Sequence, residues 1–134
     1  MKKLLFILFA AVLALSYSCK KKTDAHVPPD MAFTTSAGYT SANATIMHGD
    51  SIKVGIVITK KEDDLRTFNI SYAYDNATTS TTYLNYTMTP AEYGGWSHDY
   101  IIHSRSIAGT EKWTFTVVDR DGNLTQKSIT LTVQ

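Results

Sequence analysis

The stretch that decides the fold is Lys112 to Val133, KWTFTVVDRDGNLTQKSITLTV. In its first half, Trp113, Phe115 and Val117 fall on one face of an extended chain because side chains alternate between faces along a strand. The Asp-Gly pair in the middle supplies the positive backbone angle that tight hairpin turns need. Apolar residues then recur at every second position up to the end. The sequence predicts a β-hairpin with one face turned to a core.

The same period of two recurs upstream in short runs separated by turn-forming residues. No stretch of ten or more residues keeps the 3.6-residue period of a helix. The clearest run is Ser51–Lys60, in which four aliphatic residues share one face and Val57 is the exception. In residues 96–103 the pattern is ambiguous, because Ile101 and Ile102 point to opposite faces. Other strands are predicted over residues 66–74 and 81–89, near 31–36, and near 45–47. About seven strands with such turns predict an all-β, antiparallel β-sandwich.

The first 18 residues have the three parts of a secretory signal peptide. A basic start precedes the apolar run Leu4–Leu15, and small residues at Ser16 and Ser18 end the segment. An apolar run of this length would span roughly 18 Å as a helix, which is too short for a hydrocarbon core of about 30 Å. Cys19, which follows directly, is the only cysteine in the sequence, so the chain cannot form an internal disulfide.

The composition of the rest of the chain limits its domain organisation and its partners. Residues 19–30 contain three consecutive lysines and two prolines but few large apolar residues, which predicts a flexible tether ahead of one domain over residues 31–134. Of the 13 lysines and arginines, Lys2 and Lys3 belong to the leader, which leaves 11 against 12 acidic residues. Because this balance creates no basic field, we expect no nucleic-acid partner.

The segment Leu15-Ser16-Tyr17-Ser18-Cys19 resembles the lipobox of bacterial lipoproteins, in the looser form typical of Bacteroidetes. This resemblance implies cleavage before Cys19, acylation of that residue and anchoring to the outer membrane. Lysines stand where such lipoproteins carry an acidic export signal, which favours the periplasmic face. Ser16 occupies a position that is commonly a large aliphatic residue. The alternative is an ordinary signal-peptidase cut after Ser18, which would leave Cys19 as a free thiol.

The hairpin from Gly109 to Val133 and the run Gly49–Ile56 resemble strands of bacterial immunoglobulin-like domains found in envelope lipoproteins. The shared pattern is aromatic-x-Val-x-Asp-x-x-Gly-Asn followed by a threonine-rich strand. The resemblance implies an immunoglobulin-like β-sandwich without a cysteine pair. It also implies a non-catalytic binding or scaffolding module of unknown ligand. The alternative is a carbohydrate-binding lipoprotein of a glycan-uptake system, so the expected partners are the membrane and either a protein or a glycan.

Aromatic residues crowd the middle of the chain, between residues 72 and 100. Rings exposed on one face can stack on sugar rings, whereas buried rings simply fill the core. Tyr83, Tyr93 and Trp96 are the candidate ligand-binding residues. Burial of Trp96 would remove the carbohydrate alternative.

The sequence contains no motif that places a nucleophile beside a general base, and we expect neither an enzyme nor a cofactor. Asp119, Asp121 and Asn123 share the spacing of calcium loops and are weak metal candidates. Their flanks are predicted strands rather than helices, and turn chemistry explains these residues without a cation.

A second metal hypothesis involves His98 and His103, with Asp99 between them. Residues five apart on a strand lie on opposite faces, so the two imidazoles cannot converge on one ion. We therefore expect surface histidines.

Overall fold

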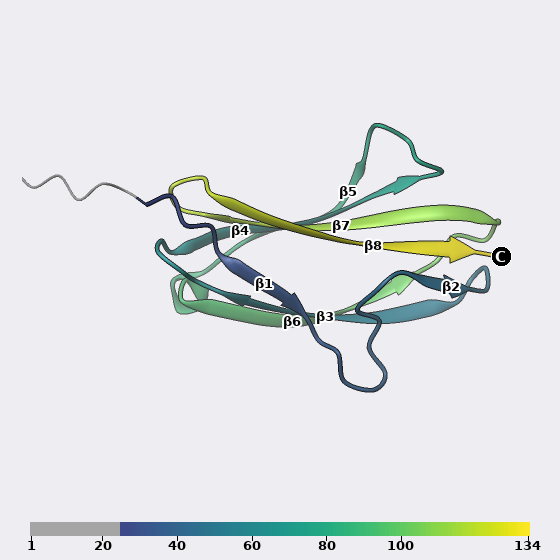
Figure 1. Ribbon diagram of the computed structural model, residues 1–134, viewed down its shortest axis with the longest axis horizontal. Coiled ribbons are helices and arrows are strands. Elements are labelled where there is room, and N and C mark those ends of the chain that lie inside the picture. The colour runs from purple at the N-terminus through teal and green to yellow at the C-terminus, as the bar shows by residue number, and fades with distance from the viewer. Residues whose placement is uncertain (1–24) are drawn as a thin grey trace, which may run out of the picture.

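The computed structural model describes residues 25–134, so the predicted signal peptide and Cys19 lie outside the described residues. Eight strands and one short 3-10 helix form two packed layers (Figure 1). Each predicted strand is present, which confirms the all-β class. The elements are β1 (Asp30–Phe33), β2 (Ala44–Ile46), β3 (Ser51–Thr59), β4 (Leu65–Tyr74), β5 (Thr81–Thr87), η1 (Pro90–Glu92), β6 (Gly95–His103), β7 (Gly109–Asp119) and β8 (Leu124–Val133).

The two sheets have unequal widths. One has three strands in the order β1-β3-β6, and the other has five in the order β2-β8-β7-β4-β5. All pairs are antiparallel except β2 with β8, which is parallel. This order matches an immunoglobulin-like sandwich, with β1, β3 and β6 in the places of strands A, B and E. The facing strands β8, β7, β4 and β5 take the places of G, F, C and C′. The fold is an immunoglobulin-like β-sandwich.

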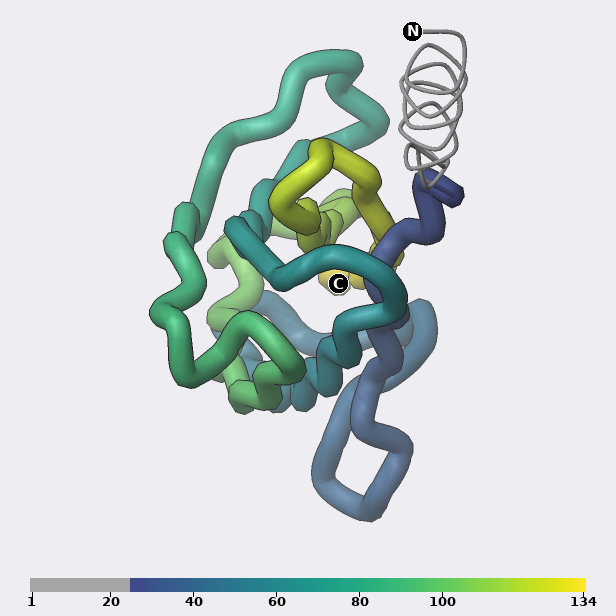
Figure 2. The backbone as a smooth tube through the Cα atoms, turned by 90° about the vertical axis from the view of Figure 1, so that its left-hand side faces the viewer, coloured from purple at the N-terminus to yellow at the C-terminus, as the bar shows by residue number. Residues whose placement is uncertain are grey.

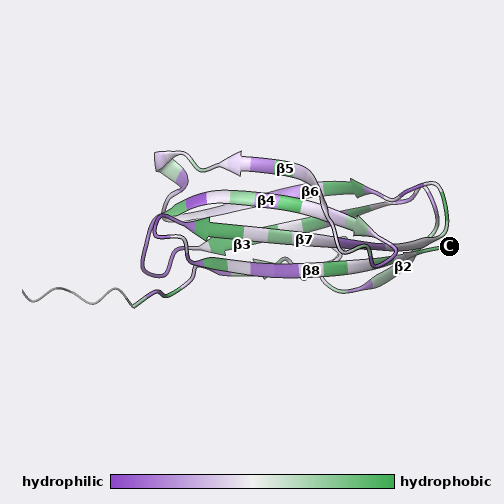
Figure 3. Cartoon of the chain, turned by 90° about the horizontal axis from the view of Figure 1, so that it is seen from above, coloured by the Kyte–Doolittle hydropathy of each residue, from purple (hydrophilic) through white to green (hydrophobic). Residues whose placement is uncertain are grey.

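The core fills the space between the sheets and follows the predicted alternation. The four aliphatic residues of β3 that the pattern assigned to one face are buried, whereas Val57 on the other face is 45% exposed. Ile102 is buried and Ile101 is exposed, which settles the orientation of β6. In Figure 3, β5 carries mostly hydrophilic and near-neutral colours, so it contributes less to the core than β3 or β7. Fully buried core side chains include Met31, Val54, Ile56, Ile58, Leu65, Phe68, Ile70, Phe115, Val117, Ile129 and Leu131.

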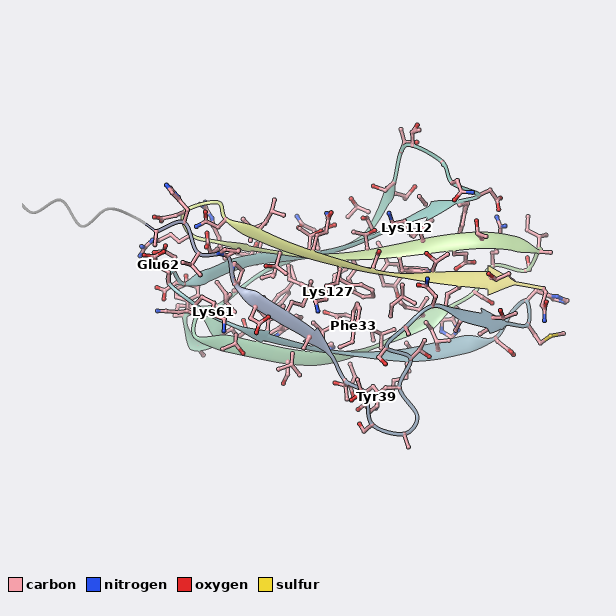
Figure 4. The ribbon with its side chains drawn as sticks, viewed as in Figure 1. Phe33, Tyr39, Lys61, Glu62, Lys112 and Lys127 are labelled. Carbon is pink, nitrogen blue, oxygen red and sulfur yellow. The ribbon has the colours of Figure 1, made fainter. Side chains whose placement is uncertain are left out.

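Residues at the start of the described chain lie against the domain. The backbone N–H groups of Ala25 and Val27 donate to the Glu62 carboxylate at 3.4 and 3.2 Å. Pro29 is buried, and its carbonyl accepts a hydrogen bond from the Thr125 hydroxyl. Figure 4 shows Glu62 at the end of the sandwich where the chain enters. Part of the segment interpreted as a tether is therefore docked on the fold.

The loop between β1 and β2 folds back over the outer face of the three-stranded sheet, below β3 in Figure 4. Backbone hydrogen bonds join Thr34 to Gly55 (2.9 Å) and Thr40 to Lys53 (2.8 Å). The Tyr39 ring then lies directly over Gly55. A Cβ at position 55 would come within 2.5 Å of the Thr34 hydroxyl and 2.8 Å of the Tyr39 ring. Glycine is needed here because the loop approaches the strand so closely.

We expect Gly55→Ala to destabilise the domain by about 1–3 kcal/mol, because the methyl group would force the 34–40 loop off the sheet. Urea unfolding followed by circular dichroism measures this effect. Gly94→Ala is the matched control, since a Cβ there meets nothing within 4 Å. Equal stability of the two variants would contradict the packing described.

Candidate functional site

A cluster of rings lies along the side of the sandwich where β5 of one sheet meets β6 of the other. We call this cluster the aromatic seam and define it as Tyr83, Tyr86, Trp96, His98 and Tyr100. Figure 2, viewed along the strands, shows the chain from β5 to η1 as the outermost part of this side. The rings are exposed or half-buried rather than fully buried. The seam is therefore an aromatic surface that remains in contact with solvent.

Trp96 is the centre of the seam. Its ring stacks with Tyr86 (centroids 5.3 Å apart, planes 14° apart) and with His98 (5.6 Å, 5°). It also meets Phe68 of the core at 5.1 Å and Tyr100 at 6.4 Å. Trp96 is half-buried, so it joins the core to the surface. Because neighbouring rings stack on it, it offers little free ring face to a ligand.

Tyr83 departs from the alternation predicted for residues 81–89. The register between β4 and β5 shifts, so that Ile70 faces Leu84 but Ser71 faces Thr82. Tyr83 is the extra residue of this β-bulge, and its ring meets the inward-pointing Trp113 edge-on at 5.3 Å. A strict period of two would have placed this ring on the outer face. It remains 49% exposed, because the facing sheet has no strand opposite β5.

Tyr93 lies apart from the other two candidates. It follows η1, and its carbonyl accepts the Leu65 N–H at 3.0 Å. Its half-buried ring lines a separate pocket of ≈ 210 Å³ with Leu65, Met88 and three charged side chains, Asp64, Arg66 and Arg120. The structure thus brings Tyr83 and Trp96 to one side of the molecule and places Tyr93 in another recess.

Glu92 fixes the polar end of the seam. The Thr89 backbone N–H (2.7 Å), the Thr89 hydroxyl (2.8 Å) and the Tyr86 hydroxyl (2.8 Å) all donate to it. These bonds, with that from the Thr89 backbone as the largest influence, hold the pKa of Glu92 below its usual range. The hydrogen bond to Glu92 raises the pKa of Tyr86. Burial raises the pKa of Tyr100 to about 12. Both shifts keep the two phenols in the neutral form.

A second polar cluster lies on the outer face of the three-stranded sheet. The Lys53 ammonium contacts Asp99 at 2.8 Å and sits 4.3 Å from the centre of the Tyr39 ring. The Tyr39 hydroxyl donates to Asp99 at 2.7 Å. Asp99 raises the pKa of Lys53, and Lys53 lowers that of Asp99. Beside this cluster is a shallow groove of ≈ 460 Å³ lined in part by Val57 and Ser97.

The sequence patterns did not reveal a buried carboxylate at the start of β7, at the end of the sandwich away from the Asp119–Asn123 turn. Glu111 is fully buried, and its two oxygens accept hydrogen bonds from the Arg105 backbone N–H (2.7 Å) and the Trp113 indole N–H (2.9 Å). Arg105 in turn holds Asp75 through two bonds of 2.7 and 2.8 Å, which lower the pKa of Asp75 to about 2. Extending the alternation of β7 backwards by two residues from Trp113 would have placed Glu111 on the inner face.

The structure also pairs Ser51 with His103, with Ser51 Oγ 2.7 Å from His103 Nδ1. Local motifs could not reveal this pair, because the two residues meet only through the pairing of β3 with β6. It lies on the exposed outer face. Within residues 25–134, His103 has no hydrogen bond to a carboxylate that would orient it as in a catalytic triad.

The residues of the metal hypotheses have structural roles. Both oxygens of Asp119 accept hydrogen bonds within the turn, from the backbone N–H groups of Asp121 and Asn123 and from the Asn123 amide. His98 stacks in the seam while His103 lies on the other face, as the strand period predicted. Among the residues that the structure describes, no three His, Cys, Asp or Glu side chains are grouped to hold a metal ion. The same part of the chain has no helix long and apolar enough to cross a membrane.

No protein-family model and no curated protein matches this sequence. Among solved structures, one chain of the complex between Zinc 2-glycoprotein and Prolactin inducible protein from human seminal plasma is similar in fold. It is 7% identical with a TM-score of 0.51, and the match covers 86% of this chain and 100% of that one. A non-cellulosomal cohesin from the archaeon Archaeoglobus fulgidus is 14% identical with a TM-score of 0.40, over 81% and 92% of the two chains. Murine CRIg is 12% identical with a TM-score of 0.40, over 81% and 99%. These likenesses concern the fold alone.

The two tryptophans should report on the seam separately. Trp113 is 3% exposed, whereas Trp96 is half-buried at the surface. We expect acrylamide to quench part of the wild-type fluorescence and almost none of the blue-shifted emission left in Trp96→Phe. Equal quenching of the two proteins would show that Trp96 is not solvent-accessible.

Proposed function

We propose that this chain is a lipoprotein of the bacterial cell envelope, anchored through acylated Cys19, whose domain is a non-catalytic binding module. The leader and the position of Cys19 support the anchor. The aromatic seam supports the binding role and is the observation on which the proposal rests. Tyrosine and tryptophan are enriched in protein interfaces because they combine a large apolar area with a polar tip.

The docked N-terminal segment defines how such an anchor would orient the domain. Only Lys20 to Asp24 separate Cys19 from Ala25, which is bonded to Glu62. The six residue steps from Cys19 to Ala25 span at most about 22 Å when the chain is extended. In the proposed lipoprotein, the end that carries Glu62 and the Asp119–Asn123 turn therefore faces the membrane. The seam runs along the side of the domain and stays accessible.

A protein ligand has more support than a glycan. Stacking on a sugar needs a ring with a free face, and Trp96 already stacks with Tyr86 and His98. Tyr93, the other ring proposed to stack beside it, lines a different pocket. Tyr83 is the most exposed ring of the seam and is suited to contact either class of ligand. The carbohydrate alternative therefore becomes one outcome of the binding test.

The anchor is tested by metabolic labelling with radioactive palmitate. We expect label in the wild-type protein and none in Cys19→Ala, because the thiol is the acylated group. Full labelling of the variant, or no labelling of either protein, would contradict the anchor.

The binding role is tested by photocrosslinking in cells that make the protein naturally. A photoreactive phenylalanine at Tyr83 should give discrete crosslinked products, because the seam contacts the ligand. The same group at Ile107 is the control, since this residue is 66% exposed in the loop before β7, outside the seam and at the end away from the proposed anchor. Protein-sized adducts support a protein ligand, and protease-resistant glycan adducts support the alternative. Identical patterns at the two positions would contradict binding through the seam.

A further inference from the structure

The three-stranded sheet ends at β6, at the side where an immunoglobulin-like sandwich can carry a fourth strand. Strand D pairs with strand E in the full arrangement. Here the chain passes from β5 into β6 through the short turn at Pro90–Glu92, and no strand of the described residues pairs with the outer edge of β6. The facing sheet extends as far as β5. One position in the smaller sheet is therefore empty opposite β5.

Backbone bonds show which groups of β6 point to this open edge. Lys60 N–H donates to the Gly94 carbonyl and Ser104 N–H to the Asp50 carbonyl, at 3.2 and 2.9 Å. Bonding toward one neighbour alternates along an antiparallel strand, so even-numbered residues of β6 bond to β3. The N–H and C=O groups of Ser97, Asp99 and Ile101 therefore point outward. They are the groups that an added strand would use.

The β6 edge has few of the features that normally prevent strand addition, and its one carboxylate, Asp99, is paired with Lys53 on the outer face. Protected edges carry lysine, proline or a bulge, or are very short. β6 is nine residues long, contains neither lysine nor proline, and pairs with β3 without a register shift. By contrast, β5 is interrupted by the bulge at Tyr83. The β6 edge is therefore regular and able to accept backbone hydrogen bonds along its length.

The inner face of β5 remains partly uncovered at the same place. Tyr83 is 49% exposed, and Leu84 and Tyr86 are half-buried although all three belong to the inner side. A strand beside β6 would place alternate side chains over these residues. Apolar side chains at those positions would remove the exposed ring surface from water.

We propose that the β6 edge binds one extended segment of a partner protein as the missing strand. This proposal rests on the binding function proposed above and specifies the class of ligand. A second copy of this chain does not fit, because the chain from β5 to η1 lies outermost on this side (Figure 2) and would separate the two β6 edges. A nine-residue edge also offers far less area than a stable dimer needs.

The charges around the edge specify the segment further. Asp99 on β6 and Glu92 at its entry are carboxylates, and Lys53 is the cation bonded to Asp99. Strands β5 and β6 contain no lysine or arginine. Asp99, Glu92 and Lys53 together therefore carry a net negative charge beside the β6 edge. The segment should have apolar residues at alternate positions toward β5 and neutral or basic residues on the outer side.

The test is selection of a random nonapeptide phage library on the full chain. We expect enriched peptides with apolar residues at every second position and neutral or basic residues between them. Binding of the synthesised peptides should fall at least about tenfold in Ile101→Pro, because proline removes an outward N–H that an added strand would use. The fold should persist, since that N–H does not bond to β3.

Asn85→Pro is the matched control, because it changes an exposed residue on the edge of β5 and should leave binding unchanged. Wild-type circular dichroism of both variants shows that they are folded, and Ser97→Lys gives a second block of the β6 edge. The proposal is overturned if no peptide is enriched, if no alternating pattern emerges, or if folded Ile101→Pro and Ser97→Lys both bind like wild type. Discrete crosslinks from Tyr83 in cells would still uphold the binding module in that case.

Discussion

Three strands must cover the inner face of a sheet that has five, and the main features of this domain depend on that inequality. Strands β8, β7 and β4 are covered by β1, β3 and β6, and the aliphatic core lies between them. At β5 the cover ends. Large rings fill the space between the sheets there, because a tyrosine or tryptophan can reach from one sheet to the other where no strand lies opposite. Trp96 bridges this side by packing on Phe68 and stacking with Tyr86.

The outer face and the β6 edge of the smaller sheet differ in how far other parts of the chain cover them. The loop that carries Tyr39 covers the outer face around Gly55, and its close approach depends on the absence of a side chain at that residue. The hydrogen bonds among Tyr39, Lys53 and Asp99 hold this loop in place. The edge of β6 has no comparable cover in the described part of the chain. A domain that protects one surface and leaves an adjacent edge regular and unpaired is suited to bind another chain there.

Local sequence patterns were sufficient for the strands but insufficient for the site. Alternation predicted the inner face of β3 and the hairpin at Asp119–Asn123, because burial and turn chemistry act over a few residues. Sheet order, the bulge at Tyr83 and the contact between Ser51 and His103 depend on residues far apart in sequence. The burial of Glu111 was not predicted, because a charged residue at an inward position depends on donors that the strand pattern does not show. Here the donors are the Trp113 indole and the Arg105 backbone. Trp96 and Tyr83 were identified by composition, whereas their shared position beside an open edge came from the topology.

The open edge of β6 can be observed by amide hydrogen exchange in the unliganded full chain. We expect exchange rates to alternate along β6, with slow exchange at Tyr100 and Ile102, whose N–H groups bond to β3. Fast exchange is expected at Asp99 and Ile101, whose N–H groups point to solvent. Uniformly slow exchange across these four residues would mean that another strand already pairs with β6 and that the edge is not open.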